Sequence, residues 1–229
     1  MPLHLLTGAG SGIGSALAAR LHARGDDLVL LARNPGRARE LEERFPGAQT
    51  IVADLATPGR LSWALSKQHL PNRIDSLIHI AGVVDLGPVI DLPVALWESQ
   101  LNVNLVSPAE LTRLLLPQLR MSKGQVLFVN SGAGLRAAPD WAAYAASKHG
   151  LKALAESLRA EEAAYGVRVS SIFPGRTATP MQLRVHQQEG KDYDPAAFID
   201  PESVATSMLT MLDLPRDAQI TDLSIRPTP

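Results

Sequence analysis

Cysteine is absent from the 229-residue chain, which excludes a disulfide framework and any cysteine-ligated metal site. A basic excess is absent as well, because 22 lysines and arginines stand against 23 aspartates and glutamates. Nucleic-acid-binding proteins present a basic surface to phosphates, so we expect no nucleic-acid partner. The six histidines show no metal-ligand spacing, and we expect no bound metal.

Long apolar runs are also missing. A membrane-spanning helix needs ~18–20 apolar residues, and no stretch of the chain approaches that length. No basic region of the kind that begins a signal peptide precedes the first apolar run, at residues 3–6. We therefore expect a cytoplasmic protein that makes no contact with membranes. The length and the 45% hydrophobic content suit one domain over residues 1–229.

Short apolar runs alternate with longer amphipathic ones from one end of the chain to the other. Most of the short runs are apolar on both faces, as in buried parallel strands. Repeated units of this kind predict an α/β fold, a doubly wound parallel sheet of about seven strands with helices on both faces. We predict strands at residues 3–6, 28–31, 50–52, 76–80, 126–129, 167–172 and 220–225, and helices at 13–21, 62–69, 97–121, 142–165 and 202–212.

Residues 176–200 form the one long segment without clear periodicity, and they contain Pro180, Gly190 and Pro195. A connection of this length inside a compact domain is usually functional. We predict that residues 176–200 form a lid over the substrate.

The first predicted strand runs into a glycine-rich turn with the pattern G-x-x-x-G-x-G. Such a turn lets the backbone approach a pyrophosphate and begins a helix whose N-terminus faces that anion. A glycine-rich turn without a ligand is the alternative, but the strand before it and the helix after it favour a dinucleotide site. The residues that we assign to this site are Gly8, Ser11, Gly12, Ile13 and Gly14.

The second predicted strand ends at Ala32-Arg33-Asn34, where a dinucleotide enzyme contacts the adenosine ribose. An acid at this point would repel a 2′-phosphate, but Asp26 and Asp27 lie at the opposite end of the strand. The planar guanidinium of Arg33 suits a phosphate instead. We therefore predict NADP(H) over NAD(H), with a solvated loop arginine as the alternative.

Tyr144 and Lys148 lie four residues apart in a predicted helix, which places the phenol and the ammonium side by side. A neighbouring cation stabilises phenolate and lowers the tyrosine pKa, which favours acid/base work. Ser131 follows a buried strand and should emerge at the carboxyl edge of the sheet, where such folds bind ligands. Asn104 lies on the long helix before that strand.

In this order and at these spacings the motifs resemble the short-chain dehydrogenase/reductase family, over nearly the whole chain. Thr7-Gly8-x-x-x-Gly12-Ile13-Gly14 is similar to its cofactor motif, and Asp54 matches its adenine-contacting acid. Asn104, seven residues after Trp97, and Ser131, thirteen before Tyr144, match its tetrad with Tyr144 and Lys148. The resemblance implies a Rossmann fold and further cofactor contacts from Ala81, Gly82, Pro174, Gly175, Thr177 and Thr179.

The resemblance also implies an NADP(H)-dependent oxidoreductase acting on a small carbonyl or alcohol. Tyr144 would exchange the proton of the substrate oxygen while Ser131 hydrogen-bonds that oxygen. Lys148 would lower the tyrosine pKa and hold the nicotinamide ribose, and Asn104 would position a water molecule. The structural alternatives are that Ser131 caps the strand end and that Asn104 bonds backbone at a helix kink.

Two rival functions stay open. An extended relative, such as a sugar-nucleotide epimerase, would need a C-terminal substrate domain that this chain lacks. A non-catalytic NADP(H)-sensing regulatory protein would keep the fold but act through a partner. The chain also departs from the family at His79-Ile80, which replace two asparagines, and we expect His79 to be a core side chain. We expect the substrate near Val83, Val84, Leu135, Trp141, Met181 and Leu183, with Arg136, Arg184 and His186 close by.

The helices at residues 97–121 and 142–165 should pack together on one face of the sheet. In the family the equivalent pair of a second subunit docks against them. Small residues such as Ala145, Ala146 and Ala153 would permit close approach, although alanine also simply favours helix. We expect a homodimer or a homotetramer.

Overall fold

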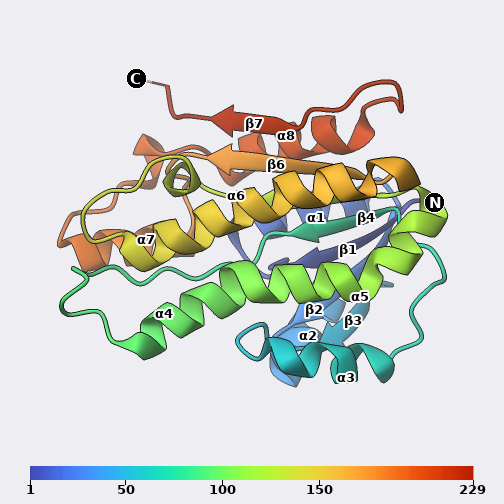
Figure 1. Ribbon diagram of the computed structural model, residues 1–229, viewed down its shortest axis with the longest axis horizontal. Helices are drawn as coiled ribbons and strands as arrows, with labels where there is room; N and C mark the ends of the chain where they lie inside the picture. Colours follow the sequence, from blue (N-terminus) through green and yellow to red (C-terminus); the bar gives the residue numbers. More distant parts are fainter. Residues whose placement is uncertain (229) are drawn as a thin grey trace.

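One parallel sheet runs through the centre of the molecule (Figure 1), which a computed structural model describes over residues 1–228. Within these residues the sheet has seven strands in the order β3-β2-β1-β4-β5-β6-β7. The predicted doubly wound α/β fold is therefore confirmed. The strands are β1 (Leu3–Thr7), β2 (Asp27–Ala32), β3 (Gln49–Val52), β4 (Ser76–His79), β5 (Gln125–Val129), β6 (Arg168–Pro174) and β7 (Asp222–Ile225).

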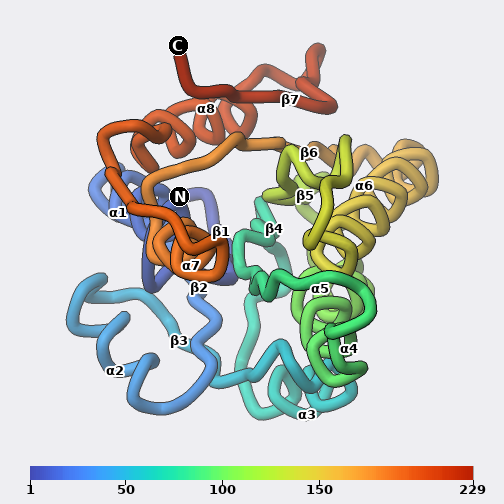
Figure 2. The backbone as a smooth tube through the Cα atoms, turned by 90° about the vertical axis from the view of Figure 1, so that its left-hand side faces the viewer, coloured from blue at the N-terminus to red at the C-terminus, as the bar shows by residue number. Residues whose placement is uncertain are grey.

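Helices cover both faces of this sheet, as Figure 2 shows with the strands seen between two helical layers. Core residues of α1, α2 and α8 pack against one face, and those of α3, α5 and α6 pack against the other. The helices are α1 (Gly12–Ala23), α2 (Pro35–Arg44), α3 (Leu61–Ser66), α4 (Val94–Leu101), α5 (Ser107–Ser122), α6 (Ala142–Glu162), α7 (Pro180–Glu189) and α8 (Pro201–Asp213).

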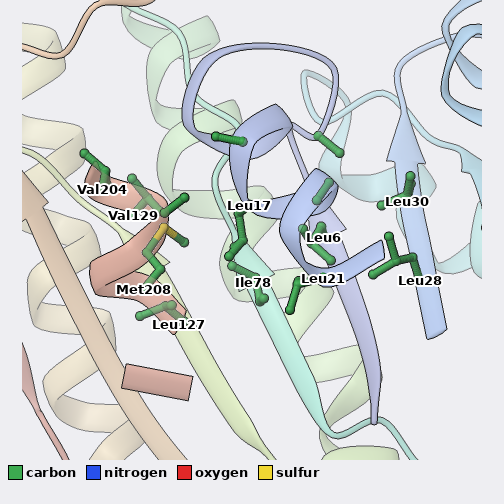
Figure 3. Close-up of a cluster of buried hydrophobic side chains, with 14 of the residues drawn as sticks. Leu6, Leu17, Leu21, Leu28, Leu30, Ile78, Leu127, Val129, Val204 and Met208 are labelled. Carbon is green, nitrogen blue, oxygen red and sulfur yellow. The ribbon is translucent and has the colours of Figure 1, made fainter. Parts of the chain in front are cut away.

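Side chains of successive strand residues point into opposite core layers, which explains why the strands are apolar on both faces. Leu5 belongs to the layer under α5 and α6, whereas Leu6 belongs to the layer under α1 and α8. Figure 3 shows Leu6 and Ile78 of the central strands beside Leu17 of α1. Burial of these side chains contributes roughly 1.5–3 kcal/mol each and fixes both helical layers on the sheet.

Three local expectations were incomplete. Residues 35–44 form α2, which the periodicity did not reveal because only Ala38 and Leu41 are buried. The segment 176–200 was expected to lack periodic structure, yet it contains α7 and a 3₁₀ turn at Pro195–Ala197. The predicted helix at 97–121 is divided into α4 and α5 by a π-helical turn at Asn102–Val106. The wider turn accommodates Asn104, whose side chain is fully buried.

The pair β1 and β4 marks the point where the strand order changes direction, and a ligand site forms at such a point. The hydroxyl of Thr7, at the end of β1, accepts hydrogen bonds from the backbone N–H groups of Ile80 (3.0 Å) and Ala81 (3.1 Å). His79 is buried, stacks on Phe128 and lies 2.9 Å from the Thr112 hydroxyl. His79 is thus the core side chain that was expected, and Thr7 ties the central strands together.

Among residues 1–228, no helix combines the length and the apolar character that crossing a bilayer requires.

Candidate active site

The glycine-rich turn after β1 is built by close backbone contacts. Gly8 has φ +76°, and a Cβ atom there would lie 2.7 Å from the backbone nitrogen of Ala81. A Cβ on Gly14 would overlap the Gly8 carbonyl oxygen, and one on Gly12 would lie 2.8 Å from Cγ2 of Thr179. Ser11 is the N-cap of α1 in extended conformation, and its side chain makes no cap hydrogen bond. The turn therefore leaves the N-terminus of α1 facing the carboxyl edge of the sheet.

A pocket of about 530 Å³ opens at this edge. Its wall combines the glycine-rich turn with the ends of β4, β5 and β6 and with parts of α6 and α7. The structure thus brings together predicted site residues from positions that are far apart in the sequence. Those lining this pocket are Gly8, Ser11, Gly12, Ile13, Gly14, Ala81, Gly82, Ser131, Tyr144, Lys148, Pro174, Gly175, Thr177 and Thr179.

A second pocket of about 480 Å³ shares Gly8, Ser11, Ala81 and Gly82 with the first and extends toward β2 and α2. Its wall includes Arg33 and Asp54, the two residues that were predicted to contact the adenosine part of the cofactor. Asp54 also accepts a hydrogen bond from the backbone N–H of Ala56 at 2.9 Å, which shapes the loop after β3. The two pockets therefore meet at the glycine-rich turn and the end of β4.

Arg37 and Arg44, both on α2, line the second pocket beside Arg33. The Arg37 guanidinium lies against the glycine-rich turn, since a Cβ on Gly10 would come within 3.4 Å of its Nη2. Arg44 donates a hydrogen bond to the Ser15 hydroxyl. Sequence reasoning missed both arginines because α2 was not recognised, although the helical spacing from Arg33 would place them on one side.

Tyr144 and Lys148 project from the first turns of α6, and both are buried. The Lys148 ammonium donates a hydrogen bond to the Val129 carbonyl at 3.0 Å and lies 5.8 Å from the centre of the Tyr144 ring. Asn130, which the sequence analysis did not select, bonds the Lys148 carbonyl with its amide at 3.1 Å. Its Oδ1 accepts the N–H of Ser131 at 2.9 Å, so Asn130 couples α6 to the end of β5.

Ser131 lies directly beyond β5, in extended conformation, as expected from its place at the strand end. Its hydroxyl accepts a hydrogen bond from the Ala133 N–H at 3.1 Å and so caps the short 3₁₀ turn Gly132–Gly134. The Ser131 side chain also interacts with Tyr144 and acts to lower the tyrosine pKa. The capping alternative and the contact with Tyr144 are therefore both present.

Burial, and not the neighbouring cation, dominates the titration of Tyr144. Burial raises the pKa of Tyr144 above its ordinary value, against the smaller lowering by Ser131. Burial also lowers the pKa of Lys148 to about 8. The direction for Tyr144 is opposite to the expectation from sequence, because burial of the phenol disfavours its charged form.

Asn104 lies in the π-helical turn, and its side chain bonds both the N–H and the carbonyl of Val83. Its Oδ1 accepts the Val83 N–H at 2.8 Å, and its Nδ2 donates to the Val83 carbonyl at 2.9 Å and to the Ser147 hydroxyl at 3.0 Å. Asn104 lines neither pocket. The structure thus contains the backbone-bonding arrangement that was the alternative for this residue, and the water-positioning role stays a prediction.

Gln100 repeats this arrangement four residues earlier on the same helix. It accepts the Asp85 N–H at 3.2 Å and donates to the Asp85 carbonyl at 3.1 Å. Asp85 in turn pairs with Arg184 of α7, and Gln188 of α7 accepts the Leu86 N–H at 3.0 Å. The segment after β4 is therefore held by α4 on one side and holds α7 on the other. Sequence reasoning missed Gln100, whose spacing from Asn104 was the available signal.

The substrate side of the first pocket is largely apolar. Val84, Tyr144 and Val185 pack with Leu86, Ala133, Trp141 and Met181 as one cluster. Of the residues expected near the substrate, Val84, Arg136, Trp141 and Met181 line this pocket. Val83 lines the second pocket.

Leu135 and Leu183 were expected in the substrate lining, but they line neither pocket. Arg184 and His186 were expected only close by, and they lie on α7 on either side of the lining residue Val185. Leu135 and Leu183 are largely exposed. Arg184 pairs with Asp85. His186 is buried in edge-to-face contact with Tyr193 and Phe198. Within residues 1–228, no group of three histidine, aspartate or glutamate side chains is arranged to hold a metal ion.

The parallel sheet and the glycine-rich turn at its carboxyl edge are those of dinucleotide-binding α/β proteins. A family model described as short chain dehydrogenase matches residues 3–190. The chain therefore belongs to the short-chain dehydrogenase/reductase family of oxidoreductases.

Known proteins similar to this chain agree with that assignment. An uncharacterized oxidoreductase of Staphylococcus epidermidis is 29% identical over 227 residues, which cover 97% of this chain and 96% of the relative. The closed form of a serine dehydrogenase complexed with NADP⁺ has a TM-score of 0.85 at 22% identity, covering 97% and 94% of the two chains. A 3-ketoacyl-(acyl-carrier-protein) reductase from Brucella melitensis complexed with NADH has a TM-score of 0.83 at 21% identity, covering 98% and 96%. At these identities the two structures show the common fold.

Proposed function

We propose that the protein transfers a hydride between NADP(H) and a small carbonyl or alcohol, with Tyr144 as the general acid and base. The observation that carries this proposal is that Ser131, Tyr144 and Lys148 line the same pocket as the glycine-rich turn. A nicotinamide ring at the Pro174–Gly175 side of the pocket and a substrate at the Trp141 side would meet at Tyr144.

The residues present fit a dinucleotide. The glycine positions are ones that a Cβ atom would fill, and the N-terminus of α1 offers backbone N–H donors to a pyrophosphate. Arg33, Arg37 and Arg44 line the pocket toward which the adenosine end would extend. When bound, the nicotinamide supplies or accepts the hydride.

The remaining chemistry belongs to this chain's own side chains. The Ser131 hydroxyl donates a hydrogen bond to the substrate oxygen and fixes the position of that oxygen. Tyr144 delivers a proton to that oxygen during reduction and removes it during oxidation. Because burial raises the pKa of Tyr144, the phenol is protonated at neutral pH and ready for reduction. Lys148, whose pKa burial lowers to about 8, holds the ribose and compensates the charge left on the phenol.

The direct test is NADPH oxidation with a panel of aldehydes, ketones and quinones, combined with calorimetric binding of NADPH. Turnover of any carbonyl with the hydride recovered in the alcohol supports the proposal. Tight NADPH binding without turnover across the panel would contradict it and favour the NADP(H)-sensing alternative.

The preference for NADP(H) is tested at Arg33. A charge-assisted hydrogen bond to phosphate contributes about 1.5–3 kcal/mol, or roughly 10–150-fold in affinity. Arg33→Asp should weaken NADPH binding by that factor and leave NADH binding unchanged or improved. Arg39→Asp, the same charge change on α2 outside both pockets, is the matched control. Equal affinities of the unmutated protein for NADPH and NADH would contradict the assignment.

The lid predicted at residues 176–200 is assigned to α7 and its flanks. Met181, Gln182 and Val185 of α7 line the pocket, so this helix covers the substrate side. Asp85 pairs with Arg184, and this contact joins α7 to the segment after β4. Opening for substrate entry would break this pair.

We also propose a cytoplasmic homodimer or homotetramer in which α5 and α6 form the interface. The predicted packing of these helices on one face of the sheet is present, since both contribute to one core layer. Light scattering at micromolar concentration tests the assembly. A monomeric mass with full specific activity would contradict it.

A further inference from the structure

The charged side chains in the wall of the first pocket are all cationic. They are Arg136, Lys148 and Arg176, and no aspartate or glutamate among the described residues lines this pocket. A wall with cations and no carboxylates attracts anions, because its low-dielectric apolar surroundings strengthen the field. Two of the three cations already have partners in the protein.

Lys148 donates to the Val129 carbonyl at 3.0 Å and lies deep in the pocket beside Tyr144. Arg176 makes a two-pronged ion pair with Glu189, at 2.6 Å and 3.0 Å. The Arg136 guanidinium, by contrast, makes neither a hydrogen bond nor an ion pair with any other residue in the described part of the chain, 1–228. Its charge is available to a ligand.

The backbone places Arg136 on the substrate side of the pocket. It follows Ser131 by five residues, and its N–H donates to the Gly132 carbonyl at 3.1 Å. Farther along the same loop, the Asp140 carbonyl accepts the Gly87 N–H at 2.8 Å, which joins the loop to the segment after β4. Ala138 and Trp141 of this region also line the pocket. The glycine-rich turn that would hold the pyrophosphate follows β1, two strands away from β5 in the sheet.

We propose that Arg136 binds the carboxylate of the substrate, so that the protein interconverts oxo acids and hydroxy acids. This inference rests on the proposed function. A guanidinium forms two parallel hydrogen bonds with a carboxylate, a geometry that also orients the rest of the molecule. The apolar cluster around Val84, Trp141 and Met181 receives the carbon chain between the carboxylate and the reacting carbonyl.

The reaction balances without any further reagent. In reduction, the carbonyl carbon gains a hydride from NADPH, the carbonyl oxygen gains a proton from Tyr144, and the C=O double bond becomes a C–OH single bond. NADPH becomes NADP⁺, and Tyr144 regains its proton from solvent. The carboxylate is unchanged and serves only as the handle for recognition.

Matched substrate pairs test this inference. We compare 2-oxo carboxylates with their methyl esters in NADPH oxidation, and 3-hydroxy carboxylates with their methyl esters in NADP⁺ reduction. The unmutated protein should prefer the acids, and Arg136→Gln should lower kcat/KM for the acids by roughly 10–150-fold while leaving the esters unchanged. Arg136→Lys should keep part of the preference, because it keeps the charge and loses the planar fork. Arg60→Gln, an exposed arginine outside both pockets, is the control for a general change of charge.

The outcomes separate this inference from the proposed function. If esters and other neutral carbonyls are reduced as well as the acids, or if Arg136→Gln slows both alike, the inference fails and the proposed function stands. If no carbonyl compound is reduced, the proposed function fails. In that case calorimetric binding of a 2-oxo carboxylate to the protein saturated with NADP⁺ decides: binding lost in Arg136→Gln supports the carboxylate site, and no binding overturns it.

Discussion

Two buried polar clusters lie at opposite edges of the sheet and differ in what they can reach. At the amino edge, the His4 ring hydrogen-bonds the Ser76 hydroxyl and lies 3.2 Å from the Asp26 carboxylate. At the carboxyl edge, Tyr144 is placed with Ser131 and Lys148. Both clusters place a serine next to a titratable side chain of a neighbouring element.

The amino-edge cluster is closed. Ser76 is 0% exposed and His4 3% exposed, and neither lines either of the two pockets. Asp26 is further bonded by Arg24 at 2.6 Å, so each polar group has its partner inside the protein. The combination of serine, histidine and aspartate is that of a hydrolase triad, yet no substrate can reach this one. A cluster of these residue types can act as a catalytic site only if it is open to a pocket. A closed cluster of the same types serves to hold neighbouring elements together.

Tyr144→Phe tests whether the carboxyl-edge cluster takes part in a reaction, because this variant removes one hydroxyl and keeps the ring against Trp141. We expect the turnover rate to fall by roughly 10²–10⁴-fold, the usual contribution of a general acid or base. The melting temperature and the NADPH affinity should stay close to those of the unmutated protein. Steady-state kinetics, calorimetry and thermal unfolding measure the three quantities. Residual activity above about a tenth would speak against proton transfer by this residue.

Lys148→Met should abolish turnover and stabilise the fold at neutral pH. Burial lowers the pKa of Lys148 from 10.5 to about 8, so at pH 7 the folded state carries a desolvated charge that costs about 3 kcal/mol. Methionine removes that cost but loses the hydrogen bond from a charged donor to Val129, worth about 1–2 kcal/mol, which leaves a net gain of about 1–2 kcal/mol in the free energy of unfolding.

The pH dependence of the Lys148→Met effect follows from the sign of the shift. Between pH 8 and 10.5 the unfolded chain binds the Lys148 proton more tightly than the folded protein, so the unmutated protein gains stability as the pH rises. The advantage of Lys148→Met should therefore shrink between pH 7 and pH 10 in denaturant titrations. A variant less stable than the unmutated protein at pH 7 would show that the buried charge is compensated.

Ser76→Ala probes the closed cluster. Loss of the hydroxyl leaves a His4 ring nitrogen buried without a partner, which costs about 1–3 kcal/mol of unfolding free energy. We expect kcat and KM to remain unchanged, because no residue of this cluster lines either of the two pockets at the carboxyl edge. Chemical denaturation together with carbonyl-reduction kinetics measures both effects. A selective loss of kcat in a fully folded variant would show that the amino edge takes part in the reaction.

His79 should make the core sensitive to acid. Burial lowers the pKa of His79 from 6.5 to about 3, so below pH 6.5 the unfolded chain binds a proton that the folded core rejects. Stability from this group is complete above pH 6.5 and is lost as the pH falls toward 3, by about 1.4 kcal/mol per pH unit. Burial lowers the pKa of His4 as well, and that loss has the same sign. His79→Leu should flatten the dependence of unfolding free energy on pH between 6.5 and 5.5, and an unchanged slope would assign the effect elsewhere.

Much of the fold could be predicted because the buried strands and most helices have recognisable patterns of apolar residues along the sequence. Strands such as β1 and β5 are largely apolar on both faces, and this property can be recognised from the sequence alone. Helix α2 was missed because it buries only two side chains, although Asn34 as N-cap and Pro35 at its start were visible. Helix α7 was missed because Gln182 and His186 occupy buried positions where a periodic pattern would have apolar residues.

In the candidate site, too, some features could be predicted from the sequence and others could not. Ser131, Tyr144 and Lys148 follow from spacing, and the structure places all three in one pocket. The partners of Asn104 and Gln100 could not be predicted, because their hydrogen bonds depend on where the segment after β4 passes α4. The direction of the Tyr144 pKa shift could not be predicted either, since burial is a property of the packed molecule.

Any side chain on Gly14 would overlap the Gly8 carbonyl. This overlap limits which substitutions a related chain can accept and still fold. The turn is required for strand and helix to approach each other, whether or not a dinucleotide ever binds. A descendant that lost Tyr144 and its chemistry would still need Gly8 and Gly14 in order to fold. Gly8 and Gly14 are therefore required by the fold, whereas Tyr144 and Lys148 of α6 are required only by the proposed reaction.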